Sequence, residues 1–265
     1  MKGKRIAVIG AGVAGLTAAL ELTRFGFQVD IIEKAAFAGG HASRLACKAT
    51  DRCVSCGACI VHQKLSQAAA QPEVRILTGS HIEKISKSQN FKIKLTQKAE
   101  DSDPTQLSLE ADAVIWATGF SVFDPRHKPY GYGIFKNVIT NLELEDIVRE
   151  AGRATKPSDR RAARSLAFIQ CVGSRDAKLN HLWCSKFCCA SALRMANLIL
   201  ARQPQTRVSF FYIDIQTFGR DFEAFYRQVQ GNVRMIRAIP GDIFQTEDGS
   251  LKVTFVNNET HETVE

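Results

Sequence analysis

Short apolar runs alternate with a helix-like segment at the start of the chain. The first run, Ile6–Ile9, is apolar at every position, which predicts a strand buried on both faces. A predicted helix over Val13–Phe25 follows, and Val29–Ile32 forms the second apolar run. A strand, a helix and a second strand in this order predict a βαβ unit with parallel strands.

The rest of the first half contains further strand-like runs. We expect a short helix that closes at Ala68–Gln71, strands at Val74–Leu77, His81–Ser86, Phe91–Thr96 and Leu107–Glu110, a polar turn at Ala99–Gln106, and another strand within Ala111–Gly119. A helix is predicted over Asn141–Gly152, because Thr140 or Asn141 can cap it and acidic residues occupy its first turn.

A second α/β unit is predicted after the polar and basic stretch Gly152–Arg164. We expect strands at Ser165–Cys171, Arg207–Ile213 and Val233–Ile236, helices at Ser185–Arg202 and Asp221–Gln230, and a run over Leu251–Asn257 that leads into a hairpin at Thr254–Val264. The fold class is therefore α/β. We predict two domains, residues 1–157 and residues 158–265, with a cysteine loop at residues 46–61 inserted in the first.

The composition is that of an ordinary globular protein. The chain has 265 residues, of which 45% are hydrophobic and 23% are charged. No run reaches the roughly 18 apolar residues that a membrane span needs, so we expect no span. Lys2, Lys4 and Arg5 before an apolar run imitate a signal peptide. The same residues also lead into a glycine-rich loop, so we expect a cytoplasmic protein.

Three glycines after the first strand predict a dinucleotide site. Gly10, Gly12 and Gly15 fit the pattern G-x-G-x-x-G between a strand and a helix. The first allows a tight turn, the second lets the backbone approach a pyrophosphate, and the third lets helix and strand pack closely. The helix would direct its free N–H groups at the phosphate. Glu33, 21 positions after Gly12, is placed to bind ribose hydroxyls. A doubly wound domain that has lost its ligand is the alternative.

A second glycine pair favours FAD over NAD. Gly39 and Gly40 follow Glu33 closely, and the strand within Ala111–Gly119 ends in Ala-Thr-Gly. Both features resemble the glutathione-reductase-like flavoproteins. That resemblance implies two dinucleotide-binding domains with Rossmann-like parallel sheets and a small antiparallel excursion before Ala-Thr-Gly. The cofactor-binding residues expected from the motif and the resemblance are Gly10, Gly12, Val13, Ala14, Gly15, Glu33, Lys34, Gly39, Gly40, His41, Ile82, Ala117, Thr118 and Gly119.

Two of these residues have a specific expectation. In the family, the segment around Ile82 passes the adenine and binds it through backbone groups. His41 could contact the flavin, although a loop histidine held by the backbone is the interpretation we favour. No side chain is assigned a catalytic role beyond the cofactors, because no Ser/His/Asp arrangement or carboxylate pair is evident.

The eight cysteines fall into two groups of four, which suggests two metal sites. Disulfides are rare in cytoplasmic proteins. The second group is Cys171, Cys184, Cys188 and Cys189. It spans a strand end, a loop and a helix start, where four thiolates can converge. Zinc is the competing metal, but adjacent cysteines are unusual in structural zinc sites. Buried free cysteines are the remaining alternative.

The first group has the spacing of ferredoxin clusters. Cys53, Cys56 and Cys59 are each separated by two residues. The expected fourth cysteine and proline do not follow, so Cys47 is our candidate fourth ligand and His62 the runner-up. Without a fourth ligand, a [3Fe–4S] cluster or zinc becomes more credible.

The second cysteine group carries a more specific resemblance. Cys171-Val-Gly-Ser-Arg-Asp and Cys184-Ser-Lys-Phe-Cys188-Cys189 resemble the heterodisulfide reductase A subunit family, and this resemblance covers nearly the whole chain. Further family positions match at Tyr212, Asp214, Thr217, Gly219, Glu223, Phe225 and Tyr226, whereas Gln216 replaces the usual arginine. In the family, the four cysteines that match this second group bind a [4Fe–4S] cluster beside FAD. The stretch around Cys53, Cys56 and Cys59 looks like the short forms of sulfur-metabolism complexes, so we expect FAD and two [4Fe–4S] clusters on the eight cysteines. The family also closes the flavin site with a final strand and a Gly-Asp motif that we do not find before Glu265, so we expect a truncated sequence.

These observations predict an electron-transfer subunit. The subunit would pass electrons between its flavin, its clusters, an electron carrier protein and the other subunits of a heterodisulfide reductase-like complex that acts on thiols, disulfides or other sulfur compounds. A flavin-dependent thiol–disulfide oxidoreductase with Cys188 and Cys189 as its redox pair is the alternative. The formal charge of +8 raises the possibility of nucleic acid. Basic residues are scattered except at Arg149–Arg164, and the cofactors would offset much of the charge, so we expect no nucleic-acid partner.

Overall fold

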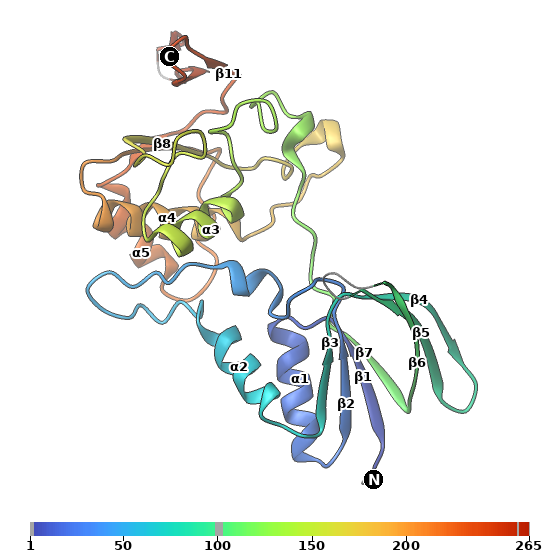
Figure 1. The fold of residues 1–265 in the computed structure, drawn as a ribbon. Coiled ribbons are helices and arrows are strands. Elements are labelled where there is room, and N and C mark those ends of the chain that lie inside the picture. Colours follow the sequence, from blue (N-terminus) through green and yellow to red (C-terminus); the bar gives the residue numbers. More distant parts are fainter. Residues whose placement is uncertain (1–2, 99–102, 259, 265) are drawn as a thin grey trace. The chain divides into compact units, whose positions relative to one another are not determined.

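The computed structural model describes residues 3–98, 103–258 and 260–264, and these residues form two compact units (Figure 1). The first unit comprises the described residues of the ranges 3–47 and 56–121, and the second comprises Lys48–Ser55 and the described residues from Val122 onward. The predicted boundary after residue 157 separates two cofactor-binding domains. The division into compact units does not test it, so it stays a prediction. Among the described residues, no helix is both long enough and apolar enough to cross a bilayer.

A parallel sheet and two helices form the core of the first unit. The strands are β1 (Arg5–Ile9), β2 (Gln28–Ile32), β3 (Val74–Leu77) and β7 (Ala113–Trp116), and the helices are α1 (Val13–Arg24) and α2 (Ile60–Ala69). The strand order is β3-β2-β1-β7, and neighbouring strands are parallel. Val8, Leu16 and Ile31 are fully buried between sheet and helices. The predicted βαβ unit is confirmed.

The opposite face of this sheet carries the antiparallel excursion, which is also confirmed. It consists of β4 (Ser80–Lys87), β5 (Phe91–Gln97) and β6 (Thr105–Ala111). Side chains alternate along β5: Ile93 and Leu95 are buried with Ile32 of the parallel sheet, whereas Lys94 is exposed. Part of the predicted polar turn at Ala99–Gln106 lies outside the described residues, and β6 begins at Thr105.

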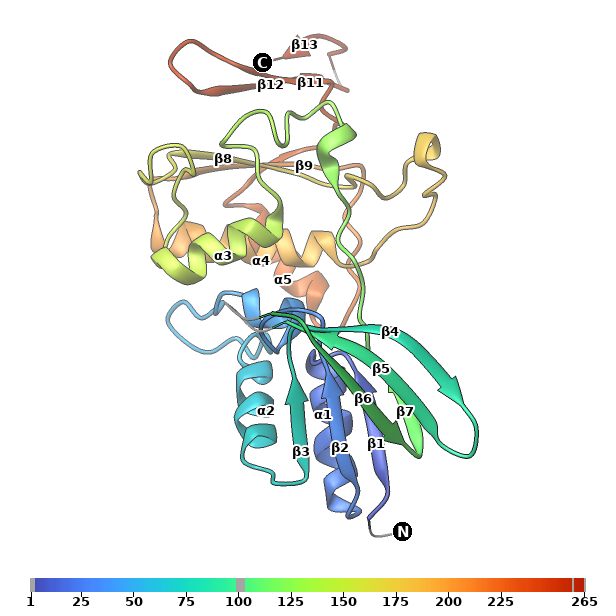
Figure 2. The ribbon, with the colours of Figure 1, turned by 45° about the vertical axis from the view of Figure 1, so that its right-hand side comes forward.

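The second unit repeats the alternation of strands and helices. Its elements are α3 (Asn141–Ala151), β8 (Ser165–Ile169), α4 (Cys188–Arg202), β9 (Arg207–Phe211), α5 (Phe222–Gln230) and β10 (Arg234–Ile236). The strands are parallel in the order β10-β9-β8. Figure 2 shows α3, α4 and α5 on the same side of β8 and β9. Leu193, Met195 and Ile199 of α4 are buried, which confirms its predicted apolar side.

Several boundaries in this unit differ from the expected ones. Strand β9 ends at Phe211 and not at Ile213, and α5 begins at Phe222 because Asp221 has a φ of 60°. Two further differences also lie at residues with positive φ. Cys171 has a φ of 60°, so β8 ends before it at Ile169. Lys186 has a φ of 58°, which is not helical, so α4 begins at Cys188 and not at Ser185. The predicted cap of α3 is confirmed. The Thr140 hydroxyl accepts from the N–H of Glu143, whose carboxylate accepts in turn from the N–H of Thr140.

An antiparallel sheet follows β10. It consists of β11 (Asp242–Gln245), β12 (Leu251–Val256) and β13 (Thr263–Val264). The Phe255 ring of β12 packs edge-on against Phe211 of β9, with 5.2 Å between ring centroids. The hairpin between β12 and β13 was predicted, whereas β11 was not. Three short helical turns, η1 (Gly40–Arg44), η2 (Pro125–His127) and η3 (Ala177–Leu179), complete the described elements.

Candidate flavin and iron–sulfur sites

Close contacts with the protein's own backbone require glycine at two positions in and after the turn between β1 and α1. Gly10 has a φ of 106°, and a Cβ there would lie 2.3 Å from the carbonyl oxygen of Ala117. A Cβ at Gly15 would lie 1.9 Å from the carbonyl oxygen of Gly10, so α1 could not pack against β1 as it does. These contacts account for the tight turn and the close helix–strand packing expected from the motif.

Gly12 is different, because nothing in the chain requires it to be glycine. Its φ of −77° suits any residue, and a Cβ there would meet no heavy atom within 4 Å. Helix α1 begins at the next residue, Val13, with its first N–H groups free for an anion. The open space at Gly12 is therefore where a pyrophosphate could approach the backbone.

Glu33 lies beside this turn as a buried carboxylate. Only 8% of the residue is exposed. Its Oε2 accepts from the N–H of Ala11 and its Oε1 from the N–H of Ala35, each at 2.8 Å. Each carboxylate oxygen keeps a free lone pair that a ribose hydroxyl could use. Lys34, the next predicted residue, is exposed.

The pair Gly39 and Gly40 packs against the turn between β1 and α1. The N–H of Gly39 donates to the carbonyl of Ala11 at 2.8 Å, and a Cβ at Gly40 would lie 3.2 Å from the Cα of Gly12. His41 follows, and its Nε2 lies 2.9 Å from the carbonyl oxygen of Phe120. This backbone contact agrees with the interpretation that we favour for His41, and flavin contact stays a prediction.

The remaining predicted flavin residues lie on neighbouring elements of the first unit. Ala117 continues β7 and donates its N–H to Ile9 at 2.8 Å, while Gly119 has a φ of 68°. Ile82 lies on β4 and packs against the buried side chains between the two sheets. The open space at Gly12, the free start of α1 and the half-satisfied carboxylate of Glu33 together fit a dinucleotide such as FAD.

The second cysteine group gathers in one region of the second unit. Cys171 follows β8, while Cys188 and Cys189 are the first residues of α4. The thiols are close enough to affect one another's pKa values. Hydrogen bonds from the Cys189 thiol and the Ser185 hydroxyl lower the pKa of Cys188 to about 6. The hydrogen bond to Cys188 and burial raise the pKa of Cys189.

Cys171 and Cys184 complete this group. Burial, followed by the neighbouring Cys188, raises the pKa of the Cys171 thiol, and the Arg175 guanidinium counteracts part of that rise. The N–H of Lys186 donates to the Sγ of Cys184 at 3.3 Å. The start of a helix, a backbone donor and a nearby guanidinium all favour thiolates, which are the ligands of iron–sulfur clusters.

A charged network beside these thiols was not predicted. The guanidinium of Arg175 donates to the Oδ1 of Asp214 at 2.6 Å, and the side-chain amide of Gln216 donates to the same oxygen at 2.8 Å. The backbone of Gln216 also hydrogen-bonds to Cys189. The sequence indicates Asp214 and Gln216 only as positions of a family pattern, and the structure places them against the cysteines.

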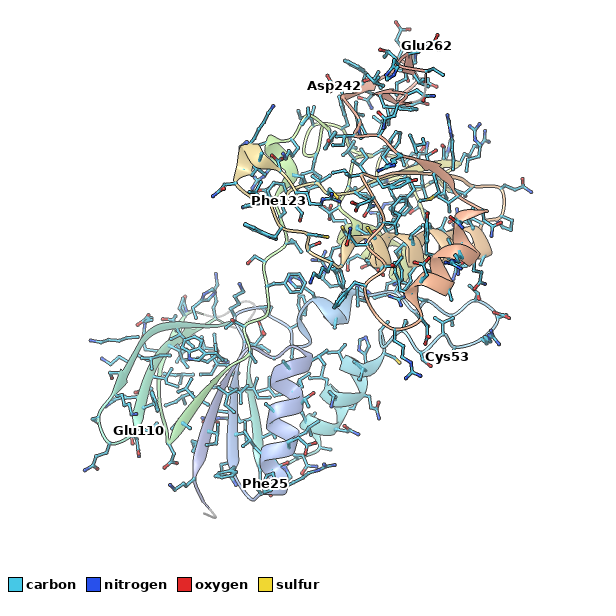
Figure 3. The ribbon with its side chains drawn as sticks, turned by 180° about the vertical axis from the view of Figure 1, so that it is seen from behind. Phe25, Cys53, Glu110, Phe123, Asp242 and Glu262 are labelled. Carbon is cyan, nitrogen blue, oxygen red and sulfur yellow. The ribbon has the colours of Figure 1, made fainter. Side chains whose placement is uncertain are left out.

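The first cysteine group lies on the exposed loop between η1 and α2, where Figure 3 labels Cys53. All four thiols are exposed. Cys53 belongs to the segment grouped with the second unit, whereas Cys47, Cys56 and Cys59 belong to the first. The alternative ligand His62 is exposed on α2. The choice of fourth ligand therefore stays a prediction.

Neither cysteine group is arranged around a single ion. Among the described residues, no three histidine, cysteine or carboxylate side chains are placed to hold one metal ion. A four-iron cluster spaces its ligands more widely, because each thiolate binds a different iron. The second group fits such a cluster because it offers four thiols, the ligand type of iron–sulfur clusters, with hydrogen-bond donors and a guanidinium beside them. The first group fits in number and spacing along the chain.

A buried ion pair fastens the first cysteine loop within the second unit. Lys48 Nζ donates to Glu145 Oε2 of α3 at 2.6 Å, and the two side chains are only 7% and 2% exposed. Most of the loop from residue 47 to 60 is exposed, so Lys48 is its principal buried polar anchor. Breaking one partner of such a pair leaves an uncompensated buried charge, which is costly.

We therefore expect Lys48→Met to lower the free energy of unfolding of the second unit by about 3–5 kcal/mol. Lys48→Met combined with Glu145→Leu should recover most of this loss, because no buried charge remains. Urea unfolding followed by circular dichroism measures both. The control is Arg227→Met, which breaks the exposed pair with Glu223 and should cost less than about 1 kcal/mol. Equal losses for Lys48→Met and Arg227→Met would contradict the expectation.

Comparisons with known proteins agree with this geometry. Curated relatives include the A subunit of the H(2):CoB-CoM heterodisulfide,ferredoxin reductase of Methanothermobacter marburgensis, 28% identical over 93% of this chain and 49% of the relative. The iron-sulfur A subunit of the CoB--CoM heterodisulfide reductase of Methanocaldococcus jannaschii is 29% identical over 91% of this chain and 49% of the relative. The chain thus spans about half the length of these curated relatives.

Solved structures show the same fold. Thioredoxin reductase of Lactococcus lactis superposes with a TM-score of 0.60 at 17% identity, over 98% of this chain and 73% of that one. The HOCl-induced flavoprotein disulfide reductase of Escherichia coli gives a TM-score of 0.55 at 16% identity, over 98% and 54%. The predicted two-domain flavoprotein fold and the resemblance to the heterodisulfide reductase A subunit family are confirmed. Residues 4–158 match the family described as pyridine nucleotide-disulphide oxidoreductase, and the chain therefore belongs to that family.

Proposed function

We propose that this protein is an FAD- and iron–sulfur-containing oxidoreductase subunit of a heterodisulfide reductase-like complex. The observation that carries the proposal is the connection between β8 and α4. In the first unit, residues 10–12 alone join β1 to α1 and form the phosphate turn. In the second unit, the equivalent connection is residues 170–187, and the four cysteines lie along it and at the start of α4.

Each unit contributes its own part to the proposed function. In the first, the free N–H groups at the start of α1 would hold the FAD pyrophosphate, and Glu33 would hold the ribose. In the second, Cys171, Cys184, Cys188 and Cys189 would hold a [4Fe–4S] cluster. FAD supplies two-electron chemistry and a cluster passes electrons singly. The cysteines of the exposed loop, Cys47, Cys53, Cys56 and Cys59, would hold a second [4Fe–4S] cluster.

Residues beside the second cysteine group would set the electrostatic environment of the cluster that it holds. Arg175 places a positive charge beside Cys171, and Asp214 orients that guanidinium through a 2.6 Å hydrogen bond. Backbone N–H groups of Lys186 and Gln216 donate to the sulfurs of Cys184 and Cys189. Donors and positive charge at the sulfurs stabilise added negative charge, so these residues favour reduction.

The partners would be the other subunits of a complex and an electron carrier protein, with the complex in the cytoplasm. Ferredoxin stands in the names of relatives, one a subunit of a heterodisulfide,ferredoxin reductase and another a subunit of a ferredoxin:heterodisulfide reductase, which supports a partner of the carrier class. The substrates would be thiols, disulfides or other sulfur compounds, handled by the complex and not by a side chain of this subunit.

One observation favours a second candidate function. The Cys188 thiol has a pKa of about 6 and accepts a hydrogen bond from the adjacent Cys189. A thiolate paired with a second thiol is the arrangement of a redox-active dithiol. The protein would then be a flavin-dependent thiol–disulfide oxidoreductase. Titration of free thiols in the iron-loaded protein separates the two, because cluster ligands do not react as free thiols.

The connection between β8 and α4 does not have the short G-x-G-x-x-G form of the first unit, which predicts that NADH and NADPH do not reduce the flavin directly. A dinucleotide needs a short turn that brings backbone N–H groups to its pyrophosphate at a helix start. The connection over residues 170–187 is long, and thiolates or a cluster there would repel phosphates. Stopped-flow mixing of the FAD-loaded protein with excess NADH or NADPH under argon is the measurement. The flavin band should persist for minutes, and bleaching within seconds without a partner would overturn the proposal.

A further inference from the structure

A cavity of about 840 Å³ lies at the amino-terminal edge of the second parallel sheet, beside the first residues of β8, β9 and β10. Strands β8, β9 and β10 run in the same direction, and Cys171 follows the opposite edge. Ser165 and Cys171 are six residues apart, roughly 20 Å along an extended chain. The cavity is therefore separate from the cysteine site. The volume is in the range of roughly 300–1,000 Å³ that small-molecule sites have.

The polar side chains that line this cavity come from all three strands and from α4. They are Ser165, Asn197, Thr206, Arg207, Ser209, Asn232 and Arg234. The Thr206 hydroxyl donates to the carbonyl of Ala163. Within the described residues, none of the other six side chains makes a hydrogen bond or an ion pair with another side chain or with the backbone. No carboxylate lines the cavity. Ser165, Arg207, Asn232 and Arg234 are exposed, whereas Asn197 and Ser209 are half-buried. The cavity is thus open to solvent and bordered by hydroxyl, amide and guanidinium donors that have no protein partner in the described part of the chain.

Strand register brings the two arginines together. Arg234 lies opposite Ser209, and Arg207 is two residues before Ser209 on the same face of β9. Strand spacing of about 4.8 Å and a rise of about 3.3 Å per residue place the two Cα atoms about 8 Å apart. Long guanidinium side chains at that separation can reach one tetrahedral anion from two sides.

The local charge favours an anion. The end of α4 borders the cavity at Ala201, and a helix C-terminus carries only about −0.5 of a charge. Two guanidinium groups outweigh it, and Arg202 in the last turn offsets it further. The basic stretch Arg149–Arg164, which no proposed function uses, leads directly into β8. The carbonyl of Arg164 accepts from the N–H of Arg207 at 2.9 Å.

We propose that this cavity binds a small phosphorylated molecule. A phosphomonoester carries about −1.5 to −2 charges, which matches two arginines better than a single carboxylate does. The hydroxyls of Ser165 and Ser209 and the amides of Asn197 and Asn232 would complete its hydrogen bonds. Leu200 and Pro204 provide an apolar wall for a ring or hydrocarbon attached to the phosphate.

The test uses the full chain as purified, with phenyl phosphate as a probe that is not a nucleotide and so does not compete for the flavin site. Isothermal titration at low salt should give saturable binding. Arg207→Gln and Arg234→Gln should each weaken it at least tenfold, and the double variant should abolish it. Phenol alone should not bind, and inorganic phosphate should bind more weakly than phenyl phosphate.

The matched control is Arg227→Gln, an exposed arginine of the same unit on α5. It should bind phenyl phosphate as the unchanged protein does. Equal weakening in Arg227→Gln would show attraction to surface charge alone and would overturn the proposal. Absence of saturable binding at millimolar phenyl phosphate would also overturn it. Flavin absorbance and iron content, measured in the same samples, should stay unchanged in all variants, which keeps this test independent of the proposed electron transfer.

Discussion

Replacing Gly12 by alanine should leave the chain folded but without FAD. The φ at Gly12 suits alanine, and the added Cβ would meet no protein atom within 4 Å, so stability should not change. The same Cβ would project into the space that the pyrophosphate needs. Losing two charge-assisted hydrogen bonds to phosphate costs about 3–6 kcal/mol, a loss of affinity of at least about 100-fold. Flavin content after purification and FAD titration of the apoprotein measure the effect.

Gly15→Ala is the contrasting variant. Its Cβ would lie 1.9 Å from the carbonyl oxygen of Gly10, so α1 and the turn must shift apart. We expect it to lower thermal stability, at a cost of roughly 1–3 kcal/mol or more. If Gly12→Ala kept wild-type FAD affinity, the phosphate role of this turn would be wrong. A Gly12→Ala protein that unfolded would contradict the open space described at this position.

Changing Cys188 to alanine should remove one cluster and leave the other in place. The second cysteine group lies wholly in the second unit, so the loop with Cys53, Cys56 and Cys59 should keep its cluster. Iron and acid-labile sulfide should each fall by about four per chain, from about eight. Cys56→Ala is the matched variant for the other group and should produce a loss of the same size. Paramagnetic resonance of the reduced proteins should show one of two cluster signals in each variant.

The iron lost in Cys188→Ala and the iron lost in Cys56→Ala should add up to the roughly eight irons of the unchanged protein. If Cys188→Ala removed both signals while circular dichroism showed an intact fold, the two cysteine groups would not bind their clusters independently. Loss of no iron in Cys188→Ala would favour the alternative in which Cys188 and Cys189 form a redox-active dithiol.

Features encoded locally were predictable from the sequence. The run Ile6–Ile9, the glycine spacing and Glu33 all lie within one βαβ unit, where neighbours along the chain are neighbours in space. The structure accordingly has strand, turn and helix where the pattern predicted them. The capping box of α3 is equally local, since Thr140 and Glu143 are three residues apart.

Features that depend on distant contacts were not predictable. The Lys48–Glu145 pair joins residues 97 positions apart, and Arg175 meets Asp214 across 39 positions. The late start of α4 follows from the positive φ of Lys186, a residue type that gives no warning of that conformation. Strand β11 is short and polar at both ends, so only its pairing with β12 identifies it. One available signal was overlooked, because Arg175 lies four residues after Cys171 and could have been proposed as its charged neighbour.

The most direct test of the account is the analysis of iron, acid-labile sulfide and flavin in protein purified under anaerobic conditions. The central claim is that the eight cysteines hold two clusters beside one FAD. About eight irons, about eight sulfides and one FAD per chain, with a brown colour, are the expected result. Zinc without acid-labile sulfide, or eight free thiols in a flavin-loaded protein, would contradict it.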